Sequence, residues 1–234
     1  MDALPQHPAL WRGGRLAQPA LPGIATGFAA LDAVLPGGGW PQDGLTELLP
    51  AGTGIGELSL VAPALARLSQ QDERWLVWIA APNSPRLPYA PALAAAGIRL
   101  PRLILVRPRS AKEALWAAKQ ALTSKSASAV LAWLDKAAAT DLRRLQLAAA
   151  GAESLALIFR PPAAAGEASP AILRLRLEAP ALRRLAVRVL KRRGGPLGQP
   201  LHLDLAAAGH DHALDRHPPA RAGAAGVPAR LGLA

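Results

Sequence analysis

A glycine-rich segment at residues 50–57 joins a short apolar run to a stretch with helical spacing. Strand, glycine-rich loop and amphipathic helix in this order form the layout in which proteins bind phosphate, because glycine amides and the amides of a helix N-terminus point at the anion. The residues that define this candidate cofactor site are Gly52, Gly54, Gly56 and Glu57. The first chemistry to examine in this chain is therefore nucleotide binding.

The side chains that carry out phosphate chemistry are missing from this loop. In the P-loop pattern G-x-x-x-x-G-K-[ST], the lysine contacts the β- and γ-phosphates and the hydroxyl binds Mg²⁺. Gly56 stands at the lysine position and Glu57 at the hydroxyl position. A carboxylate there repels phosphate by about 4 kcal/mol at ~4 Å and an effective dielectric of about 20. The dinucleotide pattern G-x-G-x-x-G also fails, because it requires glycine at 57. We therefore expect no tight ATP binding, no cofactor and no metal.

A second group of residues with binding potential lies nearer the C-terminus. Residues 171–200 contain eight basic side chains and one acid, and several of the basic residues alternate with apolar ones. Alternation places arginines on one face of a strand, across which a phosphate backbone can lie. The alternative is a solvated sheet face that protects an edge from aggregation. We predict contact with DNA or a partner protein at Arg174, Arg176, Arg184, Arg188, Lys191, Arg192 and Arg193.

Composition excludes several classes of protein. The 234-residue chain has no cysteine, which excludes disulfides, thiolate metal sites and cysteine nucleophiles. One Tyr and two Phe argue against a stacking platform for single-stranded bases. The formal net charge of +11 favours an acidic partner, and the apolar runs are too short to cross a membrane, so we expect a cytoplasmic protein. Trp40 follows three glycines, and we expect it to be exposed as an interface anchor.

Strand and helix signals alternate along the middle of the chain. Alternation with nearly continuous apolar strands predicts an α/β fold with a mostly parallel sheet and helices on its faces. Three runs with period 2 predict antiparallel strands at the edge of that sheet. The expected helices are 26–35, 57–68, 90–96, 110–122 and 140–150. The expected strands are 45–49, 75–80, 102–106, 129–134 and 155–159, followed by the period-2 runs 172–177, 185–191 and 201–205.

The two ends of the chain lack such periodicity. Residues 1–23 contain four prolines and predict an irregular arm. Residues 206–234 mix Ala, Gly, Pro, Arg and His, cannot bury enough apolar surface to offset the entropy of ordering, and predict a disordered tail. Residues 24–205 are expected to form one domain.

The segment from Thr26 to Leu48, TGFAALDAVLPGGGWPQDGLTEL, resembles the entry to RecA-type cores. With its PGGGWP stretch and its lysine-free loop, the chain is similar to the ImuA family of bacterial SOS mutagenesis accessory proteins, which are distant relatives of RecA and of the SulA division inhibitors. Two further stretches carry the resemblance, VLAWL with RRLQLAA at 130–149 and KRRGGP at 191–196. The resemblance covers about residues 24–205.

The resemblance implies a RecA-like fold without a working ATPase, acting as a non-catalytic adaptor in SOS-induced translesion DNA synthesis. It implies a Y-family-like polymerase partner (ImuB), with RecA and an error-prone C-family polymerase as further partners. Two alternatives stay open. One is a SulA-type cell-division inhibitor that binds the division GTPase. The other is a DNA-dependent ATPase of the recombinase class with a lysine from elsewhere, such as Lys191; its magnesium ligand would be Asp135, which we interpret as a surface residue.

Overall fold

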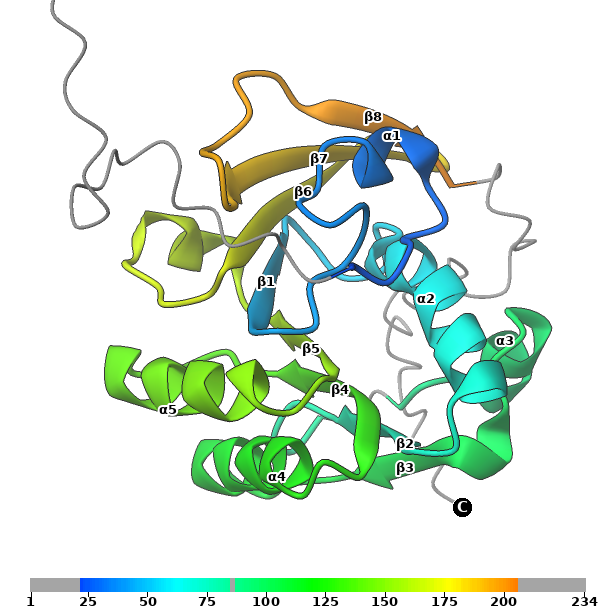
Figure 1. Cartoon of the computed structure of the whole chain (residues 1–234), viewed down its shortest axis with the longest axis vertical. Coiled ribbons are helices and arrows are strands. Elements are labelled where there is room, and N and C mark those ends of the chain that lie inside the picture. The colour runs from blue at the N-terminus through cyan, green and yellow to red at the C-terminus, as the bar shows by residue number, and fades with distance from the viewer. Residues whose placement is uncertain (1–21, 85–86, 206–234) are drawn as a thin grey trace, which may run out of the picture.

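One eight-stranded sheet organises the molecule (Figure 1). The structure is a computed structural model that describes residues 22–84 and 87–205. The strand order is β3-β2-β4-β5-β1-β6-β7-β8, parallel from β3 to β6 and antiparallel from β6 to β8. The strands are β1 Leu45–Pro50, β2 Trp75–Ile79, β3 Leu103–Val106, β4 Ala127–Trp133, β5 Leu155–Phe159, β6 Leu173–Ala181, β7 Arg184–Lys191 and β8 Leu201–Asp204.

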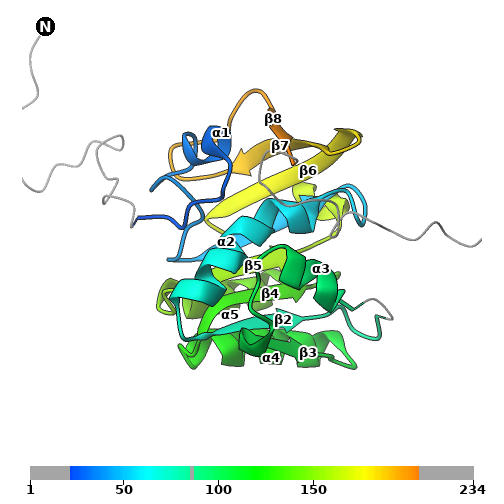
Figure 2. The ribbon, with the colours of Figure 1, turned by 90° about the vertical axis from the view of Figure 1, so that its right-hand side faces the viewer.

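Helices cover both faces of the parallel part of the sheet (Figure 2). One core cluster lies between the sheet and α1, α2 and α3, and a second lies between the sheet and α4 and α5. None of the helices in the described ranges is long and apolar enough to cross a membrane. The α-helices are α1 Ala29–Asp32, α2 Glu57–Gln71, α3 Ala90–Ala95, α4 Ala111–Thr123 and α5 Ala139–Ala150. Two short 3₁₀ turns, η1 Leu100–Arg102 and η2 Pro162–Gly166, complete the order.

The predicted α/β fold is confirmed, including the RecA-like alternation and the antiparallel strands at the C-terminal side of the sheet. The main difference lies at 26–35, where the helix is only one turn. The Thr26 amide donates to the Asp32 carboxylate at 2.8 Å, and the Phe28 amide donates to the Thr26 hydroxyl at 3.0 Å, so residues 26–28 form the entry to the helix. The predicted arm and tail lie outside the described residues, apart from 22 and 23.

The PGGGWP loop folds back onto the core. Ile24 and Trp40 form an isolated antiparallel bridge, and a Cβ atom at Gly39 would clash with the Ile24 carbonyl oxygen, so only glycine permits this approach. Trp40 is fully buried within the core cluster on the α2 face. The expectation that Trp40 is an exposed interface anchor is therefore wrong, because the glycines allow the loop to carry the indole inward.

Candidate functional site: a loop filled by its own carboxylate

The glycine-rich loop has the backbone of a phosphate-binding turn. It follows the buried strand β1 and ends where α2 begins at Glu57. Gly54 has a φ of 73° and Gly56, which precedes the helix, a φ of 104°. These are left-handed values that glycine adopts without strain. Successive amides in such a turn point inward and form a concave site for an anion.

The anion in this site is the side chain of Glu57. Its Oε1 accepts a hydrogen bond from the Gly54 amide at 3.0 Å, and its Oε2 accepts one from the Ile55 amide at 2.9 Å. Glu57 is only 4% exposed although it is ionisable. Amides that would bind a phosphate are thus already bonded to a carboxylate of the same chain, at the positive end of the α2 dipole.

The carboxyl ends of the neighbouring strands are aromatic. The indole of Trp133, the last residue of β4, stacks between Phe159 at 4.2 Å and Trp78 at 4.7 Å. Asp135 lies two residues beyond the end of β4 and is exposed, as expected for a surface residue. Within the described ranges, no group of three or more His, Cys, Asp or Glu side chains is placed to hold a metal ion. The apolar pattern of the strands predicts that these rings are buried. Their stacking on one another depends on the register of β2, β4 and β5, which the sequence pattern does not contain.

Lys191 lies away from the loop. The loop leaves β1 at Pro50, which is paired with Leu177 of β6, whereas Lys191 pairs with Arg174 toward the other end of β6. The Lys191 ammonium donates to the Ser169 carbonyl at 2.8 Å. This placement removes the support for Lys191 as a substitute for the missing P-loop lysine within one chain.

The predicted contact residue Arg174 belongs to the interior. It is 7% exposed, and its Nε donates to the Glu47 carboxylate of β1 at 2.7 Å. Its other nitrogens donate to the carbonyls of Ala164 and Glu167. The prediction that Arg174 contacts DNA or a partner is wrong, because the sheet register places it beside a buried carboxylate.

Glu47 is the centre of this buried cluster. It has no exposed surface, and it accepts a hydrogen bond from the Ser169 hydroxyl at 2.7 Å. Arg160, also buried, lies 3.6 Å from Glu47 and 2.8 Å from Glu167. The cluster connects β1, β5 and β6 to the segment around η2. A lone acid inside the apolar strand LTELLP was the sequence signal for it, since a buried charge requires a partner.

The basic turn after β7 is also bonded within the molecule. Arg193 forms an ion pair with Asp43 at 2.7 Å. Arg192 donates to the carbonyls of Val34 and Gly195. With Lys191 bonded to Ser169, the three cations of this turn fix β7 to the segment before β1 and to the η2 region. Lys191 and Arg193 are nevertheless exposed, so contact with DNA or a partner at this turn stays a prediction.

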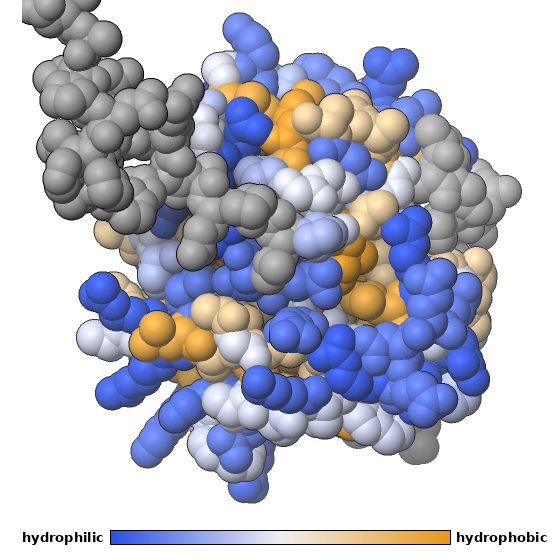
Figure 3. All heavy atoms as spheres, in the orientation of Figure 1, coloured by the Kyte–Doolittle hydropathy of each residue, from blue (hydrophilic) through white to orange (hydrophobic). Residues whose placement is uncertain are grey.

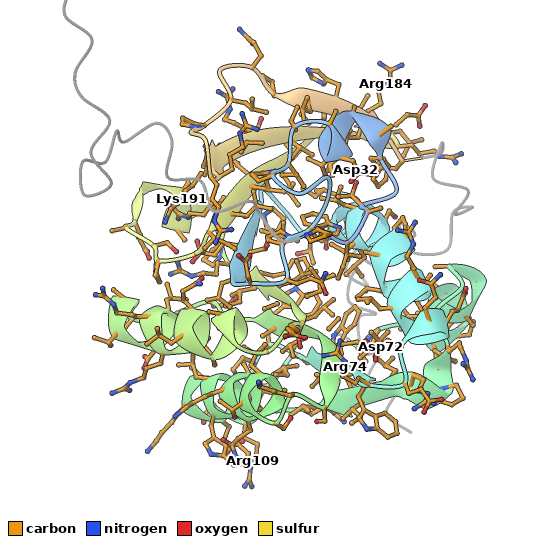
Figure 4. The ribbon with its side chains drawn as sticks, in the orientation of Figure 1. Asp32, Asp72, Arg74, Arg109, Arg184 and Lys191 are labelled. Carbon is orange, nitrogen blue, oxygen red and sulfur yellow. The ribbon has the colours of Figure 1, made fainter. Side chains whose placement is uncertain are left out.

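Three of the predicted contact residues remain on one sheet face that no helix in the described ranges covers. Arg176 pairs directly across from Arg188, and Arg184 lies across from Asp204 on β8. Arg176 is paired with Glu178 at 2.8 Å. Arg184 and Arg188 are exposed, and Figure 4 shows Arg184 projecting from β7. The positive charge of this segment is therefore compensated in part, by the acids that pair with Arg174, Arg176 and Arg193.

Comparison with known proteins places the chain in a family. The model of the family "Cell division inhibitor SulA" matches residues 53–156. The cell division inhibitor SulA of Edwardsiella piscicida is 35% identical over 121 residues, which cover 52% of this chain and 70% of that protein. Protein ImuA of Caulobacter vibrioides is 32% identical over 131 residues, so the match spans 54% of this chain and about half, 52%, of ImuA.

Among solved structures, SulA from Pseudomonas aeruginosa is 30% identical, with 50% of this chain and 97% of that chain covered and a TM-score of 0.41. The resemblance to ImuA is thus supported by one of the relatives. The sequence motifs indicate SulA only as a distant relative of ImuA. The match to SulA is nevertheless the stronger one, because its identity is higher and it covers a larger share of the matched protein. On this evidence, the chain belongs to the SulA family.

Proposed function

We propose that this chain is a non-catalytic protein that acts in the response to DNA damage by binding another protein. The observation that carries the proposal is the Glu57 carboxylate, which accepts the Gly54 and Ile55 amides of its own loop. A phosphate group would have to displace a buried anion and find neither a lysine nor a hydroxyl at the adjoining positions. On this proposal the strand–loop–helix unit has a structural role only, and the function of the protein lies in binding a partner through its surface.

Calorimetry with ATP and Mg²⁺ tests the absence of nucleotide chemistry. We expect no saturable heat of binding at millimolar ATP, with or without single-stranded DNA. A micromolar Kd that depends on Mg²⁺, or DNA-stimulated phosphate release, contradicts the proposal and favours the recombinase-class ATPase.

The family match makes the bacterial division GTPase the first partner to test. Both the family model and the relative with the higher identity are cell division inhibitors. A protein of this kind acts by stoichiometric binding, which is compatible with a filled loop. Overexpression in a rod-shaped bacterium would then cause filamentation without DNA damage, and the purified chain would bind the GTPase directly.

A second partner, the Y-family-like polymerase partner ImuB, is suggested by the match to ImuA. The family model begins at residue 53 and ends at 156, so α1, the PGGGWP loop, all of β1 and all of β6 to β8 lie outside it. The ImuA match covers 54% of this chain and 52% of ImuA. The SulA match covers 52% of this chain but 70% of SulA, which is a shorter protein.

The two partners are separated by one pair of measurements. Filamentation on overexpression, with no change in damage-induced mutation, assigns the division GTPase. Loss of damage-induced mutation on deletion, with direct binding of the purified chain to ImuB and no filamentation, assigns the polymerase complex. RecA and the C-family polymerase are tested as further partners in the same binding assay.

A further inference from the structure

Two large apolar side chains stand in solvent on the outer surface of the α4–α5 layer. Trp116 of α4 is 64% exposed and Leu147 of α5 is 71% exposed. Exposed tryptophan is uncommon on a surface with no partner, and tryptophan is enriched among the residues that dominate binding energy in interfaces. The fold itself does not explain why these two side chains are exposed.

Helix geometry makes the exposure a property of the fold rather than of one rotamer. Trp116 is two residues from Ala114 and Ala118, which are buried against the sheet. Leu147 is likewise two residues from Leu145 and Ala149, which are also buried. Two residues correspond to about 200° around a helix, so both side chains point away from the core. The two helices lie side by side on the same face of the sheet (Figures 1 and 2).

Basic residues flank both apolar side chains. Lys112 and Lys119 are four residues before and three residues after Trp116, which places them on the same side of α4. Arg143 and Arg144 are four and three residues before Leu147 on α5. Figure 3 shows mainly hydrophilic side chains projecting from the region of α4 and α5, at the lower left. We call these residues the α4–α5 face: Lys112, Trp116, Lys119, Arg143, Arg144 and Leu147.

The acids on these helices leave most of this charge uncompensated. Glu113 accepts the Arg109 amide at 2.8 Å as part of the N-terminal cap of α4. Asp141 is 3.5 Å from Arg144, an exposed pair that contributes little. No ion pair within the described ranges holds Lys112, Lys119 or Arg143. By contrast, on β6 Arg174 is paired with Glu47 and Arg176 with Glu178.

We propose that the α4–α5 face is the docking surface for an acidic segment of a partner protein that presents apolar side chains between its carboxylates. The inference rests on the proposed function, for which it names the surface and the chemistry of the partner. Trp116 and Leu147 supply apolar anchors, and the lysines and arginines pair with the carboxylates. Charge complementarity also speeds association and selects the partner.

Two other occupants fit this surface less well. Single-stranded nucleic acid is bound by series of aromatic rings, and Leu147 has no ring on which a base can stack. A second copy of the chain, placed with the same face inward about a two-fold axis, would bring like charges together. An acidic protein segment satisfies both the apolar and the basic residues of the face.

The test measures binding of a labelled synthetic peptide that carries leucines flanked by glutamates on one helical face. Fluorescence polarisation compares the full chain with Trp116→Ala, Leu147→Ala and Lys112→Glu/Lys119→Glu. The control, Arg184→Glu/Arg188→Glu, changes the charge equally on the uncovered face of β7. We expect saturable binding, weakened at least about tenfold by Trp116→Ala and by the lysine reversal, and unchanged in the control. Circular dichroism is expected to show that all variants remain folded.

Three results overturn the inference. One is absent binding, or equal loss in the control variant, which would mean attraction to net charge alone. Another is binding of an oligothymidine that depends on Trp116, in the absence of peptide binding. The third is a dimer in sedimentation that Trp116→Ala dissociates. The ATP titration does not involve the α4–α5 face. Absence of peptide binding would therefore leave the non-catalytic assignment intact, and ATP binding would leave the result of the peptide experiment intact.

Discussion

Arg174 of β6 donates a hydrogen bond to Glu47 of β1 at 2.7 Å, across 127 residues of sequence and with both side chains buried. This pair makes Arg174 part of the core, whereas Arg184 and Arg188 of the neighbouring strand are exposed. One arginine of the basic C-terminal strands thus serves to compensate a buried acid of β1.

We predict that Glu47→Ala is strongly destabilising. Removing one partner of a buried ion pair leaves an uncompensated buried charge: Arg174 would lose its carboxylate, and Arg160 would keep only Glu167. The expected loss is about 3–5 kcal/mol in the free energy of unfolding. Urea denaturation measures it. The matched control is Glu178→Ala, which removes the exposed partner of Arg176 and should cost less than about 1 kcal/mol. Equal losses in the two variants would show that the Glu47 cluster adds nothing.

A second prediction concerns the filled loop. Glu57→Ala removes the acceptor of two amides and is expected to cost about 1–3 kcal/mol. Inorganic phosphate should then bind the emptied loop and restore part of that stability, because a ligand that binds only the folded state stabilises it. Thermal unfolding of Glu57→Ala with increasing phosphate at constant ionic strength measures the effect. Wild type is the control and is expected to gain nothing specific. Equal responses in the two proteins would refute the assignment of Glu57 as an internal anion.

The two tryptophans, Trp40 and Trp116, are predicted to differ in their structural importance. Trp40→Ala empties a fully buried site in the core and is expected to cost about 3–5 kcal/mol. Trp116→Ala, at a largely exposed position, should change the free energy of unfolding by no more than about 0.5 kcal/mol. Denaturation of the two variants side by side checks this. A large loss for Trp116→Ala would mean that the indole supports the fold and would weaken its use as a binding probe.

A pH dependence is expected from the Asp72–Arg74 pair, whose side chains meet at the start of β2 (Figure 4). The hydrogen bond from Arg74 holds the pKa of Asp72 below its ordinary value of about 3.8. A carboxyl with a lowered pKa in the folded state stabilises the fold above its unfolded pKa. That contribution is lost as the pH falls through the folded pKa.

We therefore predict that Asp72→Asn is less stable than wild type at neutral pH and that the difference shrinks below about pH 4. Thermal unfolding across this range measures it. Glu73→Gln, which changes a nearly fully exposed carboxyl, is the control and should track wild type. A difference between Asp72→Asn and wild type that stays constant with pH would contradict the role of the Arg74 pair.

The succession of strands and helices along the chain and the missing P-loop lysine could both be predicted from local sequence. Apolar runs, period-2 alternation and glycine or proline breaks are local patterns, so they predicted β1 to β8 and the helix at 110–122, where α4 lies. The absence of a lysine at Gly56 is a property of the covalent chain, and it does not depend on folding.

The role of individual arginines and tryptophans, by contrast, depended on long-range contacts. Alternation predicted that Arg174, Arg176 and Arg188 share a face, but the register of β6 against β1 placed Arg174 beside Glu47 and left Arg188 in solvent. Trp40 was buried by the close approach of Gly39 to Ile24. The physical reason is that burial and pairing depend on which strand lies alongside, often more than a hundred residues away, and the local pattern of a sequence does not carry that information.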